Sequence, residues 1–188
     1  MQQKKEWVFL GIIILIGVFV LTKTIRLQSG EGNIKVVITQ QKDGISNIDT
    51  PRSISSKKTF HVTTINFPQT RVLKHKDLGE TGYSSNFFID ASVVMEVKSE
   101  GDYEFMVSSD DGFRLKIDNK AMCEHPGDRP MAATSCRVHL SKRNHLFALS
   151  YWQGGGPLGL IVKYKKIGTS RQYYVGDDSK EIRFKESK

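Results

Sequence analysis

The segment from Gly101 to Asp118 constrains the fold more than any other, because it contains two alternating apolar and polar stretches separated by a short polar break. The apolar residues of each stretch fall on one face: Tyr103, Phe105, Val107, Phe113, Leu115 and Ile117. A period of two is typical of half-buried β-strands. The adjacent residues Asp110 and Asp111 lie in the break, so we expect them at the end of a sheet and outside its core.

The same alternation recurs along most of the chain. It is clearest in the stretch that begins at Phe87, whose apolar face comprises Phe87, Ile89, Ala91, Val93, Met95 and Val97. Further strands are expected at 34–39, 60–67, 136–140, 144–152 and 158–167, with weaker ones at 173–175 and 182–184. Many short strands joined by tight turns predict an all-β, antiparallel β-sandwich or barrel.

The chain has 188 residues, enough for one globular domain and a short extra segment. That segment is N-terminal, where the basic tail 1–6 precedes fifteen uncharged residues, 7–21. At ~1.5 Å per residue these would cover roughly 22 Å of a ~30 Å hydrocarbon core, and flanking lysine side chains extend the span. We expect one transmembrane helix over 7–27, followed by a linker over 28–33. A cleavable signal peptide is the alternative, although Lys23 lies where cleavage requires small neutral residues.

Beyond the linker we expect the β-sandwich over residues 34–168 and a C-terminal extension with weak strands over 169–188. The anchor makes this a single-pass membrane protein with its C-terminal domain periplasmic or extracellular, and the Lys- and Ile-rich composition favours a bacterial inner membrane. The net charge of +8 is not concentrated in one Lys/Arg tract, so nucleic acid is not expected as a partner. Anionic polysaccharides and lipid headgroups fit such a charge better.

The two cysteines, Cys123 and Cys136, bracket a Pro- and Gly-containing segment between strand-like stretches. A disulfide between them would close a loop of about 14 residues and contribute on the order of 3 kcal/mol in an oxidising compartment. A buried reduced pair is one alternative. A zinc site with His125 and His139 is another, but this ligand spacing matches no common zinc ribbon.

Asp110 and Asp111 are the main candidates for a binding site. Adjacent carboxylates at the end of a rigid sheet repel each other unless a cation or hydrogen-bond donors compensate them, and Ca²⁺ prefers such oxygens. The alternative is a structural turn in which a carboxylate accepts backbone N–H bonds. We do not expect an enzyme, because adjacent carboxylates do not flank a glycosidic bond and the chain has no recognisable nucleophile or phosphate-binding motif.

Two stretches carry a family resemblance, GDYEFMVSSDDGFRLKIDNK and VHLSKRNHLFALSYWQGGGPLGL. They resemble the PA-fourteen domain family, named from anthrax protective antigen, most specifically over residues 99–164. The resemblance implies a β-sandwich of the kind found in bacterial glycosidases, toxins and adhesins and in yeast cell-wall lectins. In the sugar-binding members two consecutive aspartates joined by a cis peptide bind Ca²⁺, which in turn takes sugar hydroxyls. Asp110 and Asp111 match that pair.

The resemblance also implies a second loop, which here is WQGGGP at 152–157. Family lectins usually supply an Asn amide ligand from this loop, whereas this chain offers Gln153, one methylene longer. The metal set implied by the resemblance is therefore Asp110, Asp111 and Gln153, with Ca²⁺ as the cofactor.

The wider ligand-binding set implied by the resemblance adds the rest of that loop: Asp110, Asp111, Trp152, Gln153, Gly154, Gly155 and Gly156. The glycines allow backbone carbonyls to approach an ion or a sugar, or they simply form the tight turn. The indole of Trp152 offers a face for stacking on a sugar ring, or it belongs to the edge of the core.

Together these features predict a membrane-anchored, extracytoplasmic carbohydrate-binding module, assisted by Ca²⁺, that presents its domain to a glycan or cell-surface polysaccharide. The alternative is a non-catalytic structural or docking subunit that joins other envelope membrane proteins in a complex. Metal-dependent glycan binding through Asp110 and Asp111 distinguishes the two.

Overall fold

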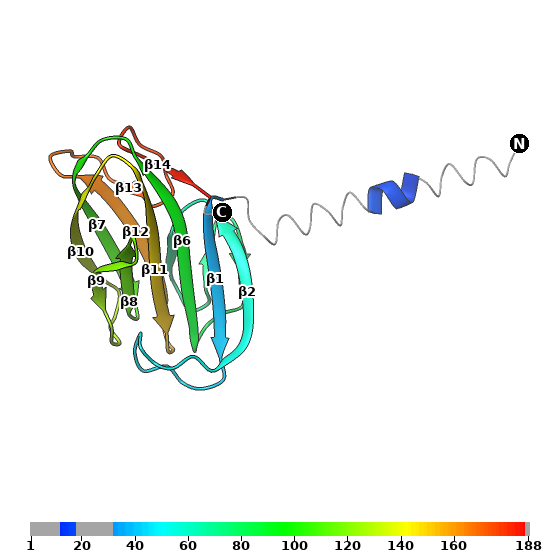
Figure 1. The fold of residues 1–188 in the computed structure, drawn as a ribbon. Coiled ribbons are helices and arrows are strands. Elements are labelled where there is room, and N and C mark those ends of the chain that lie inside the picture. Colours follow the sequence, from blue (N-terminus) through cyan, green and yellow to red (C-terminus); the bar gives the residue numbers. More distant parts are fainter. Residues whose placement is uncertain (1–11, 18–31, 187–188) are drawn as a thin grey trace, which may run out of the picture.

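The computed structural model describes residues 12–17 and 32–186, and its domain is an antiparallel β-sandwich (Figure 1). Sheet A has the strand order β2-β1-β6-β11-β8-β9, with β14 also paired to β6. Its strands are β1 (Ile34–Gln41), β2 (Ile54–Val62), β6 (Phe87–Val97), β8 (Phe113–Ile117), β9 (Lys120–His125), β11 (Asn144–Gln153) and β14 (Ile182–Lys185).

Sheet B has the order β10-β7-β12-β13, with β3 also paired to β12. Its strands are β3 (Asn66–Thr70), β7 (Gly101–Asp110), β10 (Ala132–Leu140), β12 (Leu158–Lys166) and β13 (Tyr173–Tyr174). A separate two-stranded sheet contains β4 (Lys74–His75) and β5 (Gly79–Glu80).

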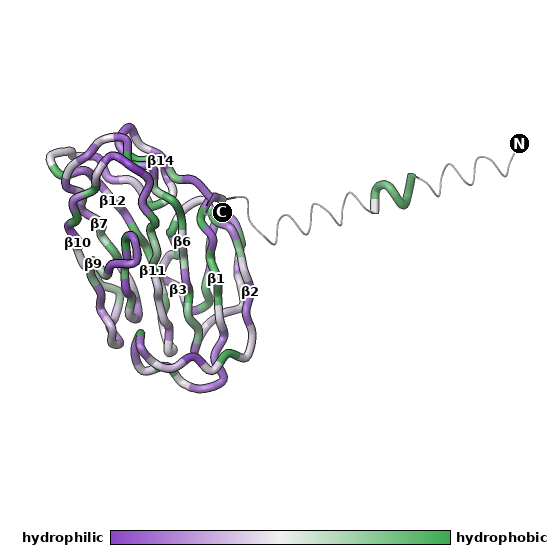
Figure 2. The backbone as a smooth tube through the Cα atoms, viewed as in Figure 1, coloured by the Kyte–Doolittle hydropathy of each residue, from purple (hydrophilic) through white to green (hydrophobic). Residues whose placement is uncertain are grey.

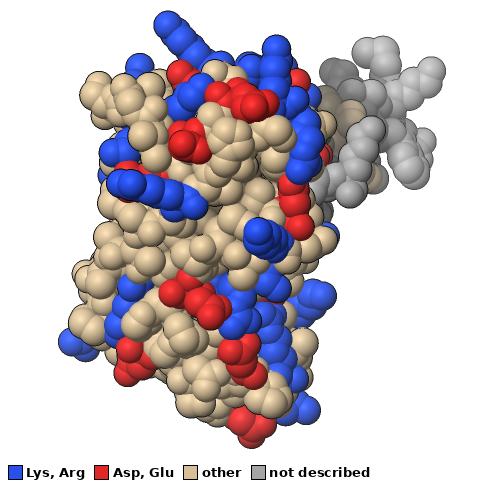
Figure 3. Space-filling view, turned by 60° about the vertical axis from the view of Figure 1, so that its left-hand side comes forward, with Lys and Arg blue, Asp and Glu red and all other residues tan. Residues whose placement is uncertain are grey.

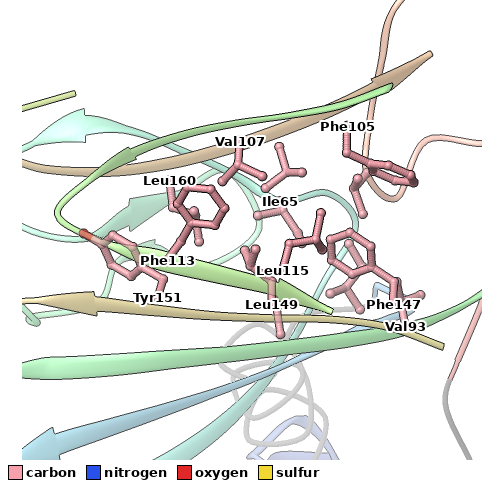
Figure 4. Close-up of a cluster of buried hydrophobic side chains, with 14 of the residues drawn as sticks. Ile65, Val93, Phe105, Val107, Phe113, Leu115, Phe147, Leu149, Tyr151 and Leu160 are labelled. Atoms are coloured by element: carbon pink, nitrogen blue, oxygen red, sulfur yellow. The ribbon is translucent and has the colours of Figure 1, made fainter. Parts of the chain in front are cut away.

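The core lies between the two sheets and contains the apolar faces expected from the alternation. Phe105 and Val107 of sheet B meet Leu115 and Phe147 of sheet A across this space (Figure 4). Hydrophobic residues run along the strands, while the connecting loops are mainly hydrophilic (Figure 2). The predicted antiparallel β-sandwich is confirmed.

The strand expected at 60–67 is wrong, because the chain bends in its middle. Strand β2 ends at Val62 and β3 begins at Asn66. The bend is fixed by Asp77, whose Oδ2 accepts hydrogen bonds from the Thr63 N–H and the Thr63 hydroxyl, both at 2.7 Å. The segment therefore contributes to both sheets and not to one long strand.

The segment at 169–188, which the sequence predicted to be an extension, contributes a strand to each of the two sheets. Strand β13 pairs with β12, and β14 pairs with β6. Val175, Ile182 and Phe184 are buried in the common core. The sandwich therefore continues beyond residue 168, where the sequence placed its boundary.

Most of the predicted transmembrane helix at 7–27 lies outside the described residues. Residues 12–17 are helical. Within the described parts of the chain, no helix is long and apolar enough to cross a membrane. The membrane anchor stays a prediction.

The sandwich has two distinct ends. We call the end at which β1 begins the proximal end, and the end at which β1, β7 and β11 finish the distal end (Figure 1). The register places Gln40 of β1 and Gln153 of β11 on opposite sides of Phe87 of β6, so their strands finish at the same level. The loops that follow these strands meet at the distal end.

Candidate functional site

Asp110 and Asp111 lie at the distal end, where β7 finishes and the chain turns through Gly112 into β8. The peptide bond between the two aspartates is cis, as the family resemblance implied. Both residues are nearly buried, with exposed fractions of 5% and 4%. The turn requires Gly112, because a Cβ there would lie 2.4 Å from Nε1 of Trp152 and 2.6 Å from the carbonyl oxygen of His125. Neighbouring loops therefore enclose the carboxylates.

Each carboxylate accepts a hydrogen bond from a different part of the chain. Asp110 Oδ2 accepts from Nε2 of Gln69, at the end of β3, at 3.1 Å. Asp111 Oδ2 accepts from the backbone N–H of Gly154 at 2.8 Å. Both donors are neutral, so these bonds orient the carboxylates without cancelling their charge.

A third carboxylate, that of Asp128, adds to the negative charge. Burial raises the pKa of Asp110, and the charge of Asp128 raises it further, while hydrogen bonds and the charge of Arg129 oppose the shift. Burial, a hydrogen bond with Asp128, and the charges of Asp128 and Asp110 raise the pKa of Asp111 to about 7. The site therefore binds protons more readily than free carboxylates do.

The nearest guanidinium, that of Arg129, is directed mainly to hydroxyl groups. Its Nη1 donates to Oγ1 of Thr134 at 2.9 Å and its Nη2 donates to Oγ of Ser109 at 2.8 Å. Its Nε is buried without a hydrogen-bond partner among the described residues. Within residues 32–186, no ion pair neutralises Asp110 or Asp111.

The second predicted loop lies beside this pair, and Gln153 determines its shape. The fully buried carboxamide of Gln153 donates from Nε2 to the carbonyl oxygens of Gly155, at 2.9 Å, and Pro157, at 3.0 Å. Its Oε1 accepts from the Tyr151 hydroxyl at 2.7 Å, and the same hydroxyl also faces the Asp110 carbonyl oxygen. Gln153 therefore stabilises the loop through these hydrogen bonds. Its role as a metal ligand stays a prediction.

Of the three predicted glycines, only Gly154 contacts an aspartate side chain. Gly155 and Gly156 lie exposed further along the loop, and Gly156 has a positive φ of 84°, which suits glycine in the turn. Trp152 is only 2% exposed, packs with Ile48 and Phe88, and donates from Nε1 to the Pro126 carbonyl oxygen at 2.9 Å. This packing corresponds to a core-edge residue, and it leaves little of the indole face for a ligand.

The disulfide between Cys123 and Cys136 is present, as predicted, with its Cα atoms 5.7 Å apart. It joins β9, at the edge of sheet A, to β10, at the edge of sheet B. The enclosed loop brings Asp128 and Arg129 against the aspartate pair, a placement that the sequence left open.

Sequence reasoning missed Gln69 and Tyr151 as parts of the site. Gln69 follows a proline in a polar stretch and carries no motif, and Tyr151 fits the core alternation of its strand equally well. Only the folded arrangement brings them to the aspartates, so no local signal identified either residue.

The site suits a hard cation such as Ca²⁺. In the part of the chain that the structure describes, no group of three or more His, Cys, Asp or Glu side chains is arranged as a metal site. A cation would therefore rely on the two carboxylates together with carbonyl oxygens and water, and Ca²⁺ accepts such mixed oxygen sets. The buried carboxyl groups of Asp110 and Asp111, which form no ion pair within residues 32–186, would supply the attraction once ionised.

Comparison with known proteins agrees with this architecture. Residues 56–148 match the PA14 domain family. The β-sandwich is a PA14 domain. The chain has no significant match among curated protein sequences.

Solved PA14 structures share the fold at low sequence identity. The PA14 domain of the antifreeze protein MpAFP is 15% identical, with a TM-score of 0.66 over 83% of this chain and 92% of the other. The PA14 sugar-binding domain of an RTX adhesin is 17% identical, with a TM-score of 0.58 over 80% and 94%. The A domain of epithelial adhesin 9 from Candida glabrata, solved with Galβ1-3GlcNAc, is 9% identical, with a TM-score of 0.55 over 85% and 96%. At these identities the likeness establishes the fold.

Proposed function

We propose that this protein is a non-catalytic carbohydrate-binding module that binds glycans at the distal end of its PA14 domain with the assistance of Ca²⁺. The observation that carries the proposal is the pair of buried carboxyl groups of Asp110 and Asp111, without an ion pair within residues 32–186, beside a glycine-rich loop. The sugar-binding RTX adhesin domain and the Candida glabrata adhesin domain, which have the same fold, support this choice of ligand.

Asp110 and Asp111 would hold the ion, and water together with carbonyl oxygens of the exposed loop at 154–157 would complete its oxygen ligands. When bound, Ca²⁺ supplies coordination positions for sugar hydroxyls. The hydrogen bonds from Gln69 and Gly154 keep the two carboxylates oriented, so little ordering is required when a ligand arrives.

The same geometry argues against hydrolysis of the bound glycan. A glycosidase needs two carboxyl groups on opposite sides of the scissile bond, about 5 Å or more apart. Asp110 and Asp111 are consecutive residues whose side chains are enclosed by loops, so we propose binding without catalysis.

The location of the site suits display from a membrane. The predicted anchor at 7–27 precedes β1, which begins at the proximal end, whereas the aspartates lie at the distal end. An anchored domain would therefore present the site away from the lipid surface, in the periplasm or outside the cell.

Calorimetric titration of the full chain in an uncharged detergent tests the proposal. We expect one Ca²⁺ per chain with a dissociation constant of about 10⁻⁴ to 10⁻³ M, the range of extracellular modules. The variant Asp110→Asn, Asp111→Asn should abolish this binding. The matched control is Asp177→Asn, Asp178→Asn, which alters another adjacent and exposed aspartate pair.

Glycan-array screening with Ca²⁺ and with a chelator then tests the ligand class. Glycan binding that requires Ca²⁺ and both aspartates supports the proposal. A folded wild-type chain that binds neither Ca²⁺ nor any glycan would contradict it and would favour a docking subunit that contacts other envelope proteins.

A further inference from the structure

A second cavity lies away from the aspartate site, between the edge strands β9 and β10 towards the proximal end. It is an open groove of about 680 Å³ between the β8–β9 turn, β9, the end of β10 and the loop into β11. The Cys123–Cys136 disulfide holds the two edges together on the distal side of the groove. This volume is within the range of small-molecule sites.

The floor of the groove is apolar because the sandwich is not closed at this edge. Ile117 and Leu140 belong to the main core, and Met122 and Val138 pack against that core while remaining partly exposed. A ligand that covers this floor would remove apolar surface from water, which favours binding.

The rim of the groove is strongly basic. Lys120, Arg137 and Arg143 line it, and Asp118 is the one acidic residue of its lining. Asp118 is already compensated, because its Oδ2 accepts from Nη2 of Arg143 at 2.7 Å and from Nδ1 of His145 at 2.8 Å. Lys120 and Arg137 form no ion pair within residues 32–186.

Acidic side chains also lie beside the rim, and each contacts a basic side chain. Glu104 forms an ion pair with Lys165 at 3.0 Å, and Asp102 accepts from Nδ1 of His139 at 2.8 Å. Basic and acidic side chains are mixed over this side of the molecule (Figure 3). The groove differs from that mixed surface because two of its basic side chains, Lys120 and Arg137, form no ion pair within residues 32–186, although Glu104 lies opposite Arg137 in the β7–β10 pairing.

We propose that this groove binds the phosphate-bearing headgroup of an anionic lipid. The basic rim would hold the phosphate, and the apolar floor would cover the adjoining glycerol and first acyl carbons. The position supports a lipid as the source of the phosphate, because the groove lies towards the end at which β1 begins, and the predicted anchor at 7–27 precedes β1 in the sequence. Clustered basic residues close to a membrane span bind anionic headgroups. This proposal does not depend on glycan binding at the distal end.

The test is a binding titration of the full chain in an uncharged detergent with short-chain phosphatidylglycerol. We expect saturable binding that Lys120→Ala, Arg137→Ala weakens at least tenfold. The matched control, Lys57→Ala, Lys58→Ala, removes two exposed charges from the opposite edge of sheet A and should change the affinity less than twofold.

A variant that keeps every charge separates the groove from general electrostatic attraction. Ala121 is an exposed residue of the lining, so Ala121→Phe should fill the groove and weaken binding at least tenfold while circular dichroism remains unchanged. Unaltered binding by this variant, or equal weakening in the lysine control, would overturn the proposal. Binding of inorganic phosphate as tight as that of the lipid, or binding of polygalacturonate in place of the lipid, would also overturn it.

Discussion

The buried carboxyl of Asp111 makes the distal site sensitive to pH. Its pKa is raised to about 7 by burial and by Asp128 and Asp110, whereas an exposed aspartate has a pKa near 3.8. In the metal-free protein the protonated form is therefore favoured by folding, so this group stabilises the fold at low pH and loses that contribution as the pH rises towards 7 and above.

The affinity for Ca²⁺ should change in the opposite direction, because the ion competes with the proton on Asp111. We expect the apparent dissociation constant to fall as the pH rises from 5 to 8, by up to about tenfold per unit below pH 7 if one proton is displaced. Calorimetry in buffers of different ionisation enthalpy measures both the affinity and the released proton. An affinity that is flat over this range would contradict the prediction.

Tyr151 links the two loops of the site through one hydroxyl. Replacing it by phenylalanine leaves the buried Oε1 of Gln153 without its donor, so Tyr151→Phe should cost about 1 to 3 kcal/mol of unfolding free energy. The loop at 154–157 should also bind Ca²⁺ less tightly. Urea unfolding compares this variant with Tyr174→Phe, whose ring is partly exposed. Equal stability of the two variants would show that the Tyr151 hydroxyl is not needed.

The aspartate pair could be located from the sequence because it interrupts a strong alternation of apolar and polar residues. The carboxylates were therefore expected at the end of the sheet and outside its core. The surroundings of the pair could not be predicted in the same way. Asp128 reaches Asp111 because the disulfide-bracketed loop folds back onto the site, and Gln69 comes from a different strand. Contacts between segments distant in the sequence leave no periodic pattern within either segment.

At the level of elements, burial decided which strands could be predicted. Strands β6, β7 and β11 alternate because one face of each is buried, and the sequence predicted them closely. The edge strand β2 is exposed over most of its length and β9 has no buried residue, so they carry little alternation and were missed wholly or in part. Backbone hydrogen bonds to the neighbouring strands hold these edge strands, which contribute only a few apolar side chains to the core.

Among the elements, the disulfide links the edge strand β9 of sheet A to the edge strand β10 of sheet B. Cys123→Ser, Cys136→Ser should lower the unfolding free energy by on the order of 3 kcal/mol, the chain-entropy value for a loop of about 14 residues. Ca²⁺ binding should weaken as well, since Asp128 lies in the released loop. Guanidinium unfolding of the oxidised and the reduced wild type provides the control, and the reduced protein should match the variant.

At the scale of the whole molecule, the two proposed sites lie towards opposite ends of the sandwich. Glu104, which lies opposite Arg137 of the groove in the β7–β10 pairing, is six residues before Asp110 in β7, a distance of roughly 20 Å at about 3.3 Å per residue. This separation exceeds the Debye length of about 8 Å at physiological salt, so charges at one end interact little with ligands at the other. The two proposed ligands, a lipid surface and a glycan, would therefore not exclude each other.

This arrangement predicts that two lysines are acylated at different rates when the full chain is reconstituted in lipid vesicles. Lys120 borders the groove, whereas the exposed Lys42 directly follows β1 at the distal end. Because the basic rim would face the bilayer, anionic vesicles should slow acylation of Lys120 several-fold relative to uncharged vesicles and leave Lys42 unaffected. Mass spectrometry of the acylated peptides measures both rates in one sample. Protection of Lys42 in place of Lys120 would place the distal end against the membrane, and the aspartate site would then face lipid and not an external glycan.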